Sequence, residues 1–170
     1  MRILRNVIAN VTLGVLPPTR LFKVKRVILR TIGFEIAEGA KLTGRIRFYG
    51  RGEISFGENC WIGIGCTFYT AVGAGVVIEK NCDIAPEVVF HTGTHLLGPS
   101  ERRAGKGSSS QIVVGEGCWL GCRATVLSGV VIAPGCIVAA GACVNKTVVE
   151  RDVLVAGTPA KIKRKIDAQS

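Results

Sequence analysis

The two histidines of this 170-residue chain stand close together, in the segment His91-Thr92-Gly93-Thr94-His95. Imidazole is the side chain best suited to accept a proton near neutral pH, so a general base is sought here first. The polar, glycine-rich and basic residues 96–111 follow directly. Because a long loop without structure of its own inside a compact domain is usually functional, we expect the site where His95 meets this loop. A surface histidine with no role remains the alternative, more so for His91.

A six-residue apolar periodicity organises the chain on both sides of this loop. Nearly every sixth residue is apolar from Ile36 to Phe90, and the series resumes in the same frame from Val114 to Val144. This period is neither that of a helix nor that of a strand, and it is typical of a solenoid of hexapeptide units, each a short strand and a turn. Three units close one triangular coil. The pattern predicts an all-β fold, a left-handed parallel β-helix of somewhat under six coils.

Small residues recur at one turn position of these units, where the backbone is expected to adopt a positive φ. They are Gly39, Gly57, Gly63, Gly75, Gly117, Gly129, Gly135 and Gly141, with Asn81 once.

The cysteines fall mostly within the same apolar frame. The large apolar position takes Cys60 and Cys66, and the small position four residues later takes Cys82, Cys118 and Cys136. The frame therefore predicts that these five are buried free thiols. Cys122 and Cys143 fall outside it. No Cys-x-x-Cys pair occurs, which argues against zinc, and we expect no metal.

The first 33 residues do not follow the periodicity. Met1–Leu16 is mostly apolar, Pro17 and Pro18 end any helix there, and Thr19–Arg30 interleaves cations with apolar residues. This pattern predicts two short amphipathic helices. Two compatible roles stay open for them: a cap over the first coil of the solenoid, and contact with an anionic membrane surface.

The charge balance indicates an anionic partner. The net charge is +10, which suits nucleic acid, a membrane surface or a phosphorylated small molecule. Since no apolar run approaches the length of a membrane span and the start lacks the pattern of a secretory leader, we expect an intracellular, cytoplasmic protein. The expected organisation is an N-terminal segment (1–33), a β-helix domain (34–165) with its loop 96–111, and a tail (166–170).

Several motifs carry a resemblance to a known family. They are Ile84-Ala85-Pro86, Thr94-His95, the loop with Arg102-Arg103, Val114–Gly121, Val138–Ala142 and Ala156–Lys161. Through them, residues 36–165 resemble the hexapeptide-repeat acyltransferases. The similarity is greatest to the branch that holds the galactoside, maltose and xenobiotic O-acetyltransferases and their polysaccharide-modifying relatives.

The resemblance implies a reaction and a set of roles. Enzymes of this family move an acetyl group from acetyl-CoA directly to a hydroxyl or amine. The matched base is His95, and the matched oxyanion donor is the backbone N–H of Cys122. The residues matched to coenzyme A are Trp119 and Ala140 for its pantetheine arm, and Lys146, Lys161 and Arg164 for its phosphates. Glu101 and backbone carbonyls are open candidates for orienting His95.

The resemblance also implies a homotrimer with the donor cleft between neighbouring β-helices. Two departures from the family bear on the acceptor. The asparagine and acidic residue that the sugar acetyltransferases use have no counterpart around Gly65–Gly73, and a basic amphipathic segment replaces their usual N-terminus. That segment resembles the start of acetyltransferases of exopolysaccharide, capsule and lipopolysaccharide assembly. The resemblance and the charge together imply a sugar hydroxyl as the acceptor, on a sugar or on a lipid-linked sugar, and action in the cytoplasm or at the inner face of the membrane.

Other functions remain as alternatives. A xenobiotic O-acetyltransferase would share the donor chemistry, and a non-enzymatic hexapeptide scaffold would share the fold. A γ-class carbonic anhydrase needs three histidine ligands for zinc, and this chain has two histidines. Nucleic-acid binding lacks an accompanying aromatic platform, so no nucleic-acid partner is expected.

Overall fold

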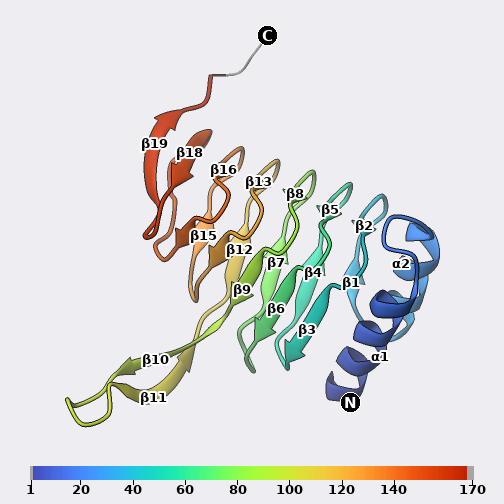
Figure 1. Cartoon of the computed structure of the whole chain (residues 1–170), viewed down its shortest axis with the longest axis horizontal. Helices are drawn as coiled ribbons and strands as arrows, with labels where there is room; N and C mark the ends of the chain where they lie inside the picture. The colour runs from blue at the N-terminus through green and yellow to red at the C-terminus, as the bar shows by residue number, and fades with distance from the viewer. Residues whose placement is uncertain (1, 168–170) are drawn as a thin grey trace.

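The molecule is a solenoid capped by helices. The computed structural model describes residues 2–167. Helices α1 (Arg2–Val15) and α2 (Phe22–Thr31) precede a solenoid of parallel strands in about six turns, which confirms the predicted left-handed parallel β-helix. The coils stack along the long axis, with both helices at one end and the last two strands at the other (Figure 1). Residues 168–170 of the expected tail lie outside the described residues.

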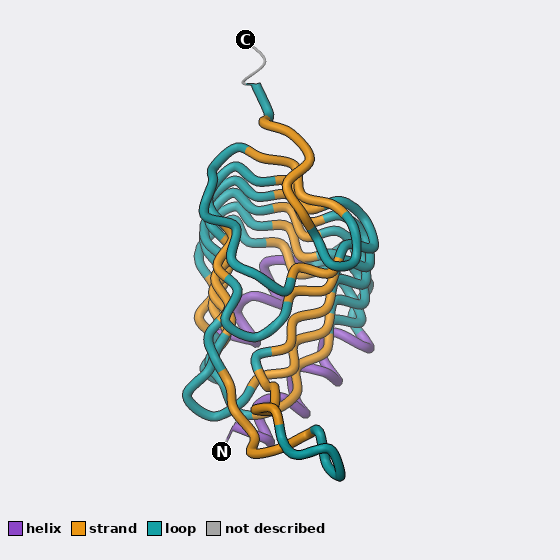
Figure 2. Tube along the Cα trace, turned by 90° about the vertical axis from the view of Figure 1, so that its left-hand side faces the viewer, coloured by secondary structure: helices purple, strands orange, loops and turns teal. Residues whose placement is uncertain are grey.

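Three sheets form the sides of the solenoid, and their strands lie in rows from coil to coil (Figure 2). The first sheet holds β1 (Glu35–Ile36), β4 (Ile54–Phe56), β7 (Val76–Ile78), β12 (Ile112–Val114) and β15 (Val131–Ile132). The second holds β2 (Lys41–Leu42), β5 (Trp61–Ile62), β8 (Asp83–Ile84), β13 (Trp119–Leu120), β16 (Ile137–Val138), β18 (Val153–Ala156) and β19 (Lys161–Lys165). The third holds β3 (Arg47–Gly50), β6 (Thr67–Thr70), β9 (Val89–His91), β14 (Thr125–Val126) and β17 (Cys143–Val144).

The core is a set of columns in which one side chain of each coil packs on its equivalents above and below. Phe48, Phe68 and Phe90 form such a column along the third sheet, with ring centroids 5.4 and 4.8 Å apart. All three are fully buried. Each strand thus contributes inward apolar residues to a continuous core, which a single hexapeptide could not form alone.

The coils are not all of one length, and this corrects the predicted frame. Strand register pairs Ile36 with Phe56, and Phe56 with Ile78. The chain therefore takes eight residues from Phe48 to Phe56, and ten from Phe68 to Ile78, where six is the rule. Both excesses lie at the corner between the third and first sheets. Together they equal one hexapeptide, which is why the six-residue frame resumes afterwards.

The assignments made within the shifted stretch were accordingly wrong. Cys60 and Cys66 occupy the small position of the coil rather than the large one, and Val72 lies in a turn with 69% of its surface exposed. Among the glycines, those whose positive φ is contradicted are Gly57, Gly63 and Gly75. In that stretch Asn59 and Gly65 have the positive φ instead.

Four cysteines stack in one column at the corner between the first and second sheets. They are Cys60, Cys82, Cys118 and Cys136, in successive coils. The thiols donate to carbonyls one coil further on, with Sγ–O distances such as 2.9 Å from Cys60 to Glu79 and 3.1 Å from Cys82 to Gly115. The prediction of five buried free thiols, Cys66 included, is confirmed.

A thiol reagent is expected to modify Cys122 rapidly in the folded protein, Cys143 more slowly, and the five core cysteines only after unfolding. Cys122 is exposed, whereas burial raises the pKa of the Cys66 and Cys118 thiols to about 12 and keeps them protonated. Pulse labelling with mass spectrometry, with and without denaturant, measures the difference. The variant Cys122→Ala should lose the fast phase alone. Fast native labelling of any core thiol would contradict this arrangement.

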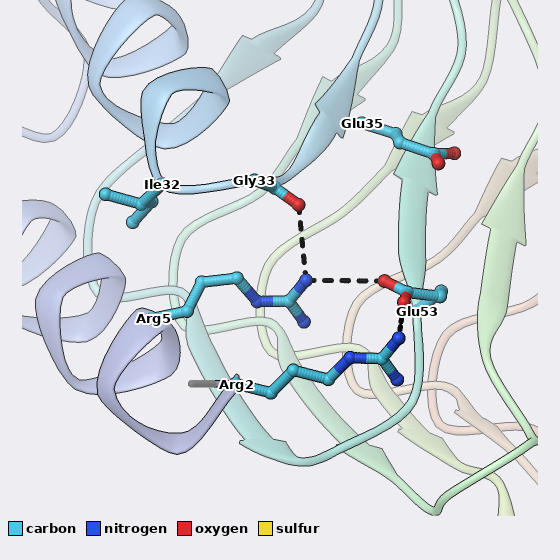
Figure 3. Close-up of a pocket in the computed structure, with 6 residues that line it drawn as sticks. All are labelled: Arg2, Arg5, Ile32, Gly33, Glu35 and Glu53. Atoms are coloured by element: carbon cyan, nitrogen blue, oxygen red, sulfur yellow. Dashed lines mark hydrogen bonds and ion pairs between the residues drawn. The ribbon is translucent and has the colours of Figure 1, made fainter.

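Both expected helices form, and they cap the first coil. Asn10 replaces the neighbour that edge strand β3 lacks: its side-chain amide donates to the Phe48 carbonyl over 3.1 Å and accepts from the Phe48 N–H over 2.8 Å. Arg5 donates to the Gly33 carbonyl and pairs with Glu53, which Arg2 also contacts (Figure 3). Neither helix has the length and continuous apolar character of a membrane-crossing segment.

The inserted segment after His91 is a hairpin rather than a loop without structure of its own. Strands β10 (Gly93–Leu97) and β11 (Ala104–Ser109) pair antiparallel and project from the solenoid at the corner between the third and first sheets (Figures 1 and 2). The basic tail also forms a strand, β19, antiparallel to β18. The break in the six-residue period correctly located the start of the hairpin. The period could not predict the antiparallel pairing of the two hairpin strands, because that pairing is not part of the repeat.

Candidate functional site

His95 lies in the first strand of the hairpin. It stands opposite Gly107 of β11, with its side chain exposed. Its imidazole makes no hydrogen bond within residues 2–167. Glu101, a candidate for orienting it, accepts a hydrogen bond from Ser100 over 2.8 Å at the hairpin tip instead. The Glu101 N–H and the Ser100 hydroxyl hold the pKa of that carboxyl below its usual value.

Thr92 anchors the foot of the hairpin. Its fully buried hydroxyl accepts from the Ala71 N–H over 2.9 Å and donates to the Ala74 carbonyl over 3.1 Å. Its carbonyl accepts from the N–H of Ser110 over 3.0 Å and from the hydroxyl of Ser128 over 2.7 Å. Both ends of the insertion are therefore tied to one point, three residues before His95.

The variant Thr92→Val is expected to lower the free energy of unfolding by about 1–3 kcal/mol, because it leaves a part-buried N–H and a buried carbonyl without their partner. Denaturant unfolding measures this loss. Thr92→Ser keeps the hydroxyl and should cost less. A larger loss in Thr92→Ser than in Thr92→Val would show that the methyl group, and not the hydrogen bonds, holds the hairpin foot.

Cys122 lies at a different corner, between the second and third sheets. A cavity of about 550 Å³ opens there, lined by Pro86, Glu87, Cys122, Arg123, Ala140 and Gly141. The Cys122 carbonyl accepts from the Gly141 N–H over 2.8 Å, whereas the Cys122 N–H has no acceptor within the part of the chain that the structure describes. Gly121 allows the close packing, since a Cβ there would stand 2.5 Å from the Ala140 nitrogen. The corner thus presents an unpaired N–H donor beside a cavity.

Three other predicted residues share the outer face of the second sheet. Trp119 on β13 is 54% exposed and pairs in register with Ile137 of β16. Arg164 and Lys161 lie on β19, the last strand of this sheet, three strand spacings or about 14 Å from β13. An aromatic ring, a cavity and two cations therefore follow one side of the solenoid.

Within one chain, the predicted catalytic and coenzyme-A-binding residues do not all lie at one place. Cys122 and Ala140 line one cavity, with Trp119, Lys161 and Arg164 on the adjoining sheet. His95 stands on the hairpin at another corner, and Lys146 follows β17 at that same corner. The residues matched to the base and to the oxyanion donor are thus separated by the width of the third sheet.

The sequence pattern did not predict a column of aromatic side chains that point outward from the third sheet at the foot of the hairpin. Tyr49 stacks on Tyr69 at 5.1 Å, and Tyr69 stacks on His91 at 4.5 Å with nearly parallel planes. These rings border a cavity of about 190 Å³ that reaches Gly93, the first residue of β10. The signal was present as three phenylalanine–aromatic pairs, Phe48-Tyr49, Phe68-Tyr69 and Phe90-His91. The unequal coil lengths concealed that these pairs are equivalent.

Comparisons with known proteins agree with this architecture. Residues 111–146 match the family described as bacterial transferase hexapeptide (six repeats), and residues 53–86 match the hexapeptide repeat of succinyl-transferase. The solved galactoside acetyltransferase in complex with coenzyme A superposes with a TM-score of 0.79 at 23% identity, over 96% of this chain and 80% of that one. A hexapeptide-repeat acetyltransferase of Vibrio cholerae, complexed with acetyl coenzyme A, gives 0.71 at 24% identity, over 96% and 86%.

Relatives of known sequence establish the family. The Escherichia coli protein WbbJ, named as a lipopolysaccharide biosynthesis O-acetyl transferase, is 30% identical over 74% of this chain and 67% of its own length. The Escherichia coli protein WcaF, named as a colanic acid biosynthesis acetyltransferase, is 25% identical over 86% of this chain and 78% of its own length. A Saccharomyces cerevisiae protein named as an acetyltransferase is 33% identical over 65% and 58%. The chain belongs to the hexapeptide-repeat acyltransferases.

The match with these relatives is partial in length. The chain spans 54 to 64% of the first curated relatives that it matches.

Proposed function

We propose that this protein is an acetyl-CoA-dependent O-acetyltransferase that modifies a sugar hydroxyl during the assembly of a bacterial polysaccharide. The observation that carries the proposal is the Cys122 corner. A backbone N–H without an acceptor among the described residues lies beside a cavity there, and an exposed tryptophan and a cationic strand lie on the adjoining sheet, in a chain of this family. The names of the relatives WcaF and WbbJ support a polysaccharide acceptor.

His95 acts as the general base in the proposed reaction. Its imidazole takes the proton of the acceptor hydroxyl while the oxygen attacks the thioester carbonyl carbon. The Cys122 N–H donates to the oxyanion that forms, and donors placed in this way contribute strongly to catalysis. The intermediate then collapses with cleavage of the carbon–sulfur bond. The imidazolium returns the proton to the leaving thiolate, so the products are the acetyl ester and the free thiol of CoA.

The second sheet holds the donor in this proposal. Trp119 and Ala140 contact the pantetheine arm, and Lys161 and Arg164 bind the phosphates. An extended arm between the cavity and β19 suits the spacing of these residues along the sheet. Lys146 reaches the donor from the same corner as the hairpin.

A homotrimer completes the proposed site. His95 and Cys122 lie at different corners of one solenoid, so a single chain does not pair base with oxyanion donor. In a ring of three parallel solenoids, the hairpin corner of one protomer meets the Cys122 corner of the next, and a heterologous contact of this kind closes after three copies. The separation of His95 from the cavity supports an active site shared between protomers.

The acceptor approaches from the hairpin side in this proposal. The stacked rings of Tyr49, Tyr69 and His91 line the cavity beside Gly93, and in this proposal the sugar packs against the edges of that column. The protein is cytoplasmic and works at the inner face of the membrane, where residues 1–30 contact anionic lipid.

The proposed activity is tested with purified protein, acetyl-CoA and a panel of acceptors, by following release of the CoA thiol. Nucleotide- and lipid-linked sugars are expected to raise the rate over the acceptor-free background, and mass spectrometry should show one added acetyl group. A rise with hydroxylated antibiotics alone would favour the xenobiotic alternative. No thiol release with any acceptor, together with no binding of acetyl-CoA, would favour a scaffold.

A further inference from the structure

The outer face of α1 is apolar and exposed to solvent. Its residues are Ile3, Leu4, Val7, Ile8, Val11 and Val15, each between 39 and 78% exposed. They recur at the helical spacing that puts them on one stripe. A stripe of this kind on a small protein is far larger than the scattered single apolar residues that normal surfaces carry.

The polar residues of α1 point the opposite way, toward the solenoid. Arg5, Asn6 and Asn10 meet the unpaired edge of the first coil, where Asn6 donates to the Gly50 carbonyl over 2.9 Å. Figure 3 shows Arg5 and Arg2 directed at Glu53. The inward face also buries Ala9 and Leu13 in the core, so α1 carries apolar residues on both faces, whereas a cap made for water has a polar outer face. These inward contacts hold the apolar stripe outward.

The charge around this stripe identifies what covers it. Residues 1–34 contain seven cations and no acidic residue. Most of these cations are engaged within the chain: Arg2 and Arg5 with Glu53, Arg26 and Arg30 with Glu38, and buried Lys25 with the Pro18 carbonyl. Arg20 and Lys23 are exposed and make no ion pair within the described residues.

Helix α2 adds to the same end of the molecule, beside α1 (Figure 1). Leu21, Val24 and Val27 are each about half exposed there, next to Arg20 and Lys23. Apolar groups with flanking cations fit a surface that is apolar inside and anionic outside. A second copy of this chain fits less well, since it would bring the same cations together.

We infer that α1 and the start of α2 dock on the surface of an anionic phospholipid bilayer. The apolar stripe enters the boundary between headgroups and acyl chains, and Arg20 and Lys23 contact lipid phosphates. With 14 residues, α1 is about 21 Å long and lies in the plane of the surface. The solenoid axis then points away from the bilayer. This inference specifies which residues contact the membrane in the proposed function. It rests on the proposed function only where that function makes the acceptor lipid-linked.

Vesicle sedimentation tests the docking, with the full chain and no acetyl donor or acceptor. The protein is expected to sediment with vesicles of phosphatidylcholine mixed with phosphatidylglycerol, and less with phosphatidylcholine alone. Val7→Glu should weaken partitioning about tenfold or more. Val149→Glu adds the same charge at an 82% exposed site far from α1 and should leave strong binding. Because no transfer is measured, failure of docking and failure of the activity are distinguishable.

A second pair of substitutions keeps the inference testable if Val7→Glu unfolds, which thermal melting reveals. Arg20→Ser and Lys23→Ser should each reduce the preference for anionic vesicles, by about fivefold. Equal partitioning of Val7→Glu and Val149→Glu, or no sedimentation of the unaltered chain, would overturn the inference. So would a particle in vesicle-free buffer whose mass falls by half on Val7→Glu, since a second copy would then occupy the stripe.

Discussion

Replacement of His95 by alanine is expected to lower kcat for acetyl transfer by on the order of 10²-fold or more, the usual effect of losing a general base. Binding of acetyl-CoA should persist, because four of the five matched donor residues lie on the second sheet or at the Cys122 corner, away from the hairpin, and only Lys146 shares the hairpin corner. The exposed imidazole makes no hydrogen bond within residues 2–167, so its removal should leave the fold intact. Thiol release gives kcat, and calorimetry gives the Kd of acetyl-CoA.

His91→Ala is the matched control, four residues earlier in the same segment. Its ring is partly buried and stacks on Tyr69, so it is not free to meet a hydroxyl in the way that His95 is. We expect a much milder loss, expressed mainly in the KM of the acceptor. Full activity of His95→Ala would refute the general-base role. A parallel loss of acetyl-CoA binding would assign His95 to donor binding instead.

Phe68→Ala is expected to lower the free energy of unfolding by about 3–5 kcal/mol. Phe68 is fully buried between Phe48 and Phe90, and the ring of Phe56 meets it edge-on at 5.5 Å. A cavity at this point interrupts the column through which three successive coils contact one another. Because the coils above and below are held by other columns, collapse can fill little of the space. Denaturant unfolding followed by circular dichroism gives the loss.

Phe68→Leu provides the graded comparison. It keeps most of the apolar volume and is expected to cost about 1–2 kcal/mol. If alanine and leucine proved equally costly, ring stacking rather than filled volume would govern the column. If neither variant were measurably destabilised, the coils would not depend on this column.

The solenoid was predictable because its signal is redundant. Some sixteen hexapeptides repeat the same apolar position, so an error in a few of them leaves the fold unaffected. The register of single residues was less secure. Insertions after β3 and β6 moved Cys60 and Cys66 from one core column to another, and because the two insertions sum to one hexapeptide, the outer frame concealed the shift. Burial of these cysteines was nevertheless correct, since both columns face the core.

The sequence predicted the position of His95 in the candidate site, but not the hairpin that carries it or the aromatic rings beside it. His95 stood out as one of two histidines at the only long break in the period, and the structure places it on a projecting hairpin. The hairpin itself lies outside the hexapeptide pattern, and its glycine-rich strands lack the alternation that marks paired strands. The stacked rings of Tyr49 and Tyr69 depend on knowing which residues are equivalent between coils, which the inserted residues obscured.

The contacts at the two ends of the solenoid have a consequence for solubility. A stack of parallel strands ends in unpaired N–H and C=O groups, and such edges invite end-to-end polymerisation. Asn10 occupies the edge at Phe48. At the far end, β19 turns back antiparallel on β18, and the Cys143 backbone of β17 bonds to Gly157 and Ala160 over 3.0 and 2.8 Å. The edges of β3 at one end and β17 at the other are therefore covered, which opposes end-to-end stacking of solenoids through the third sheet.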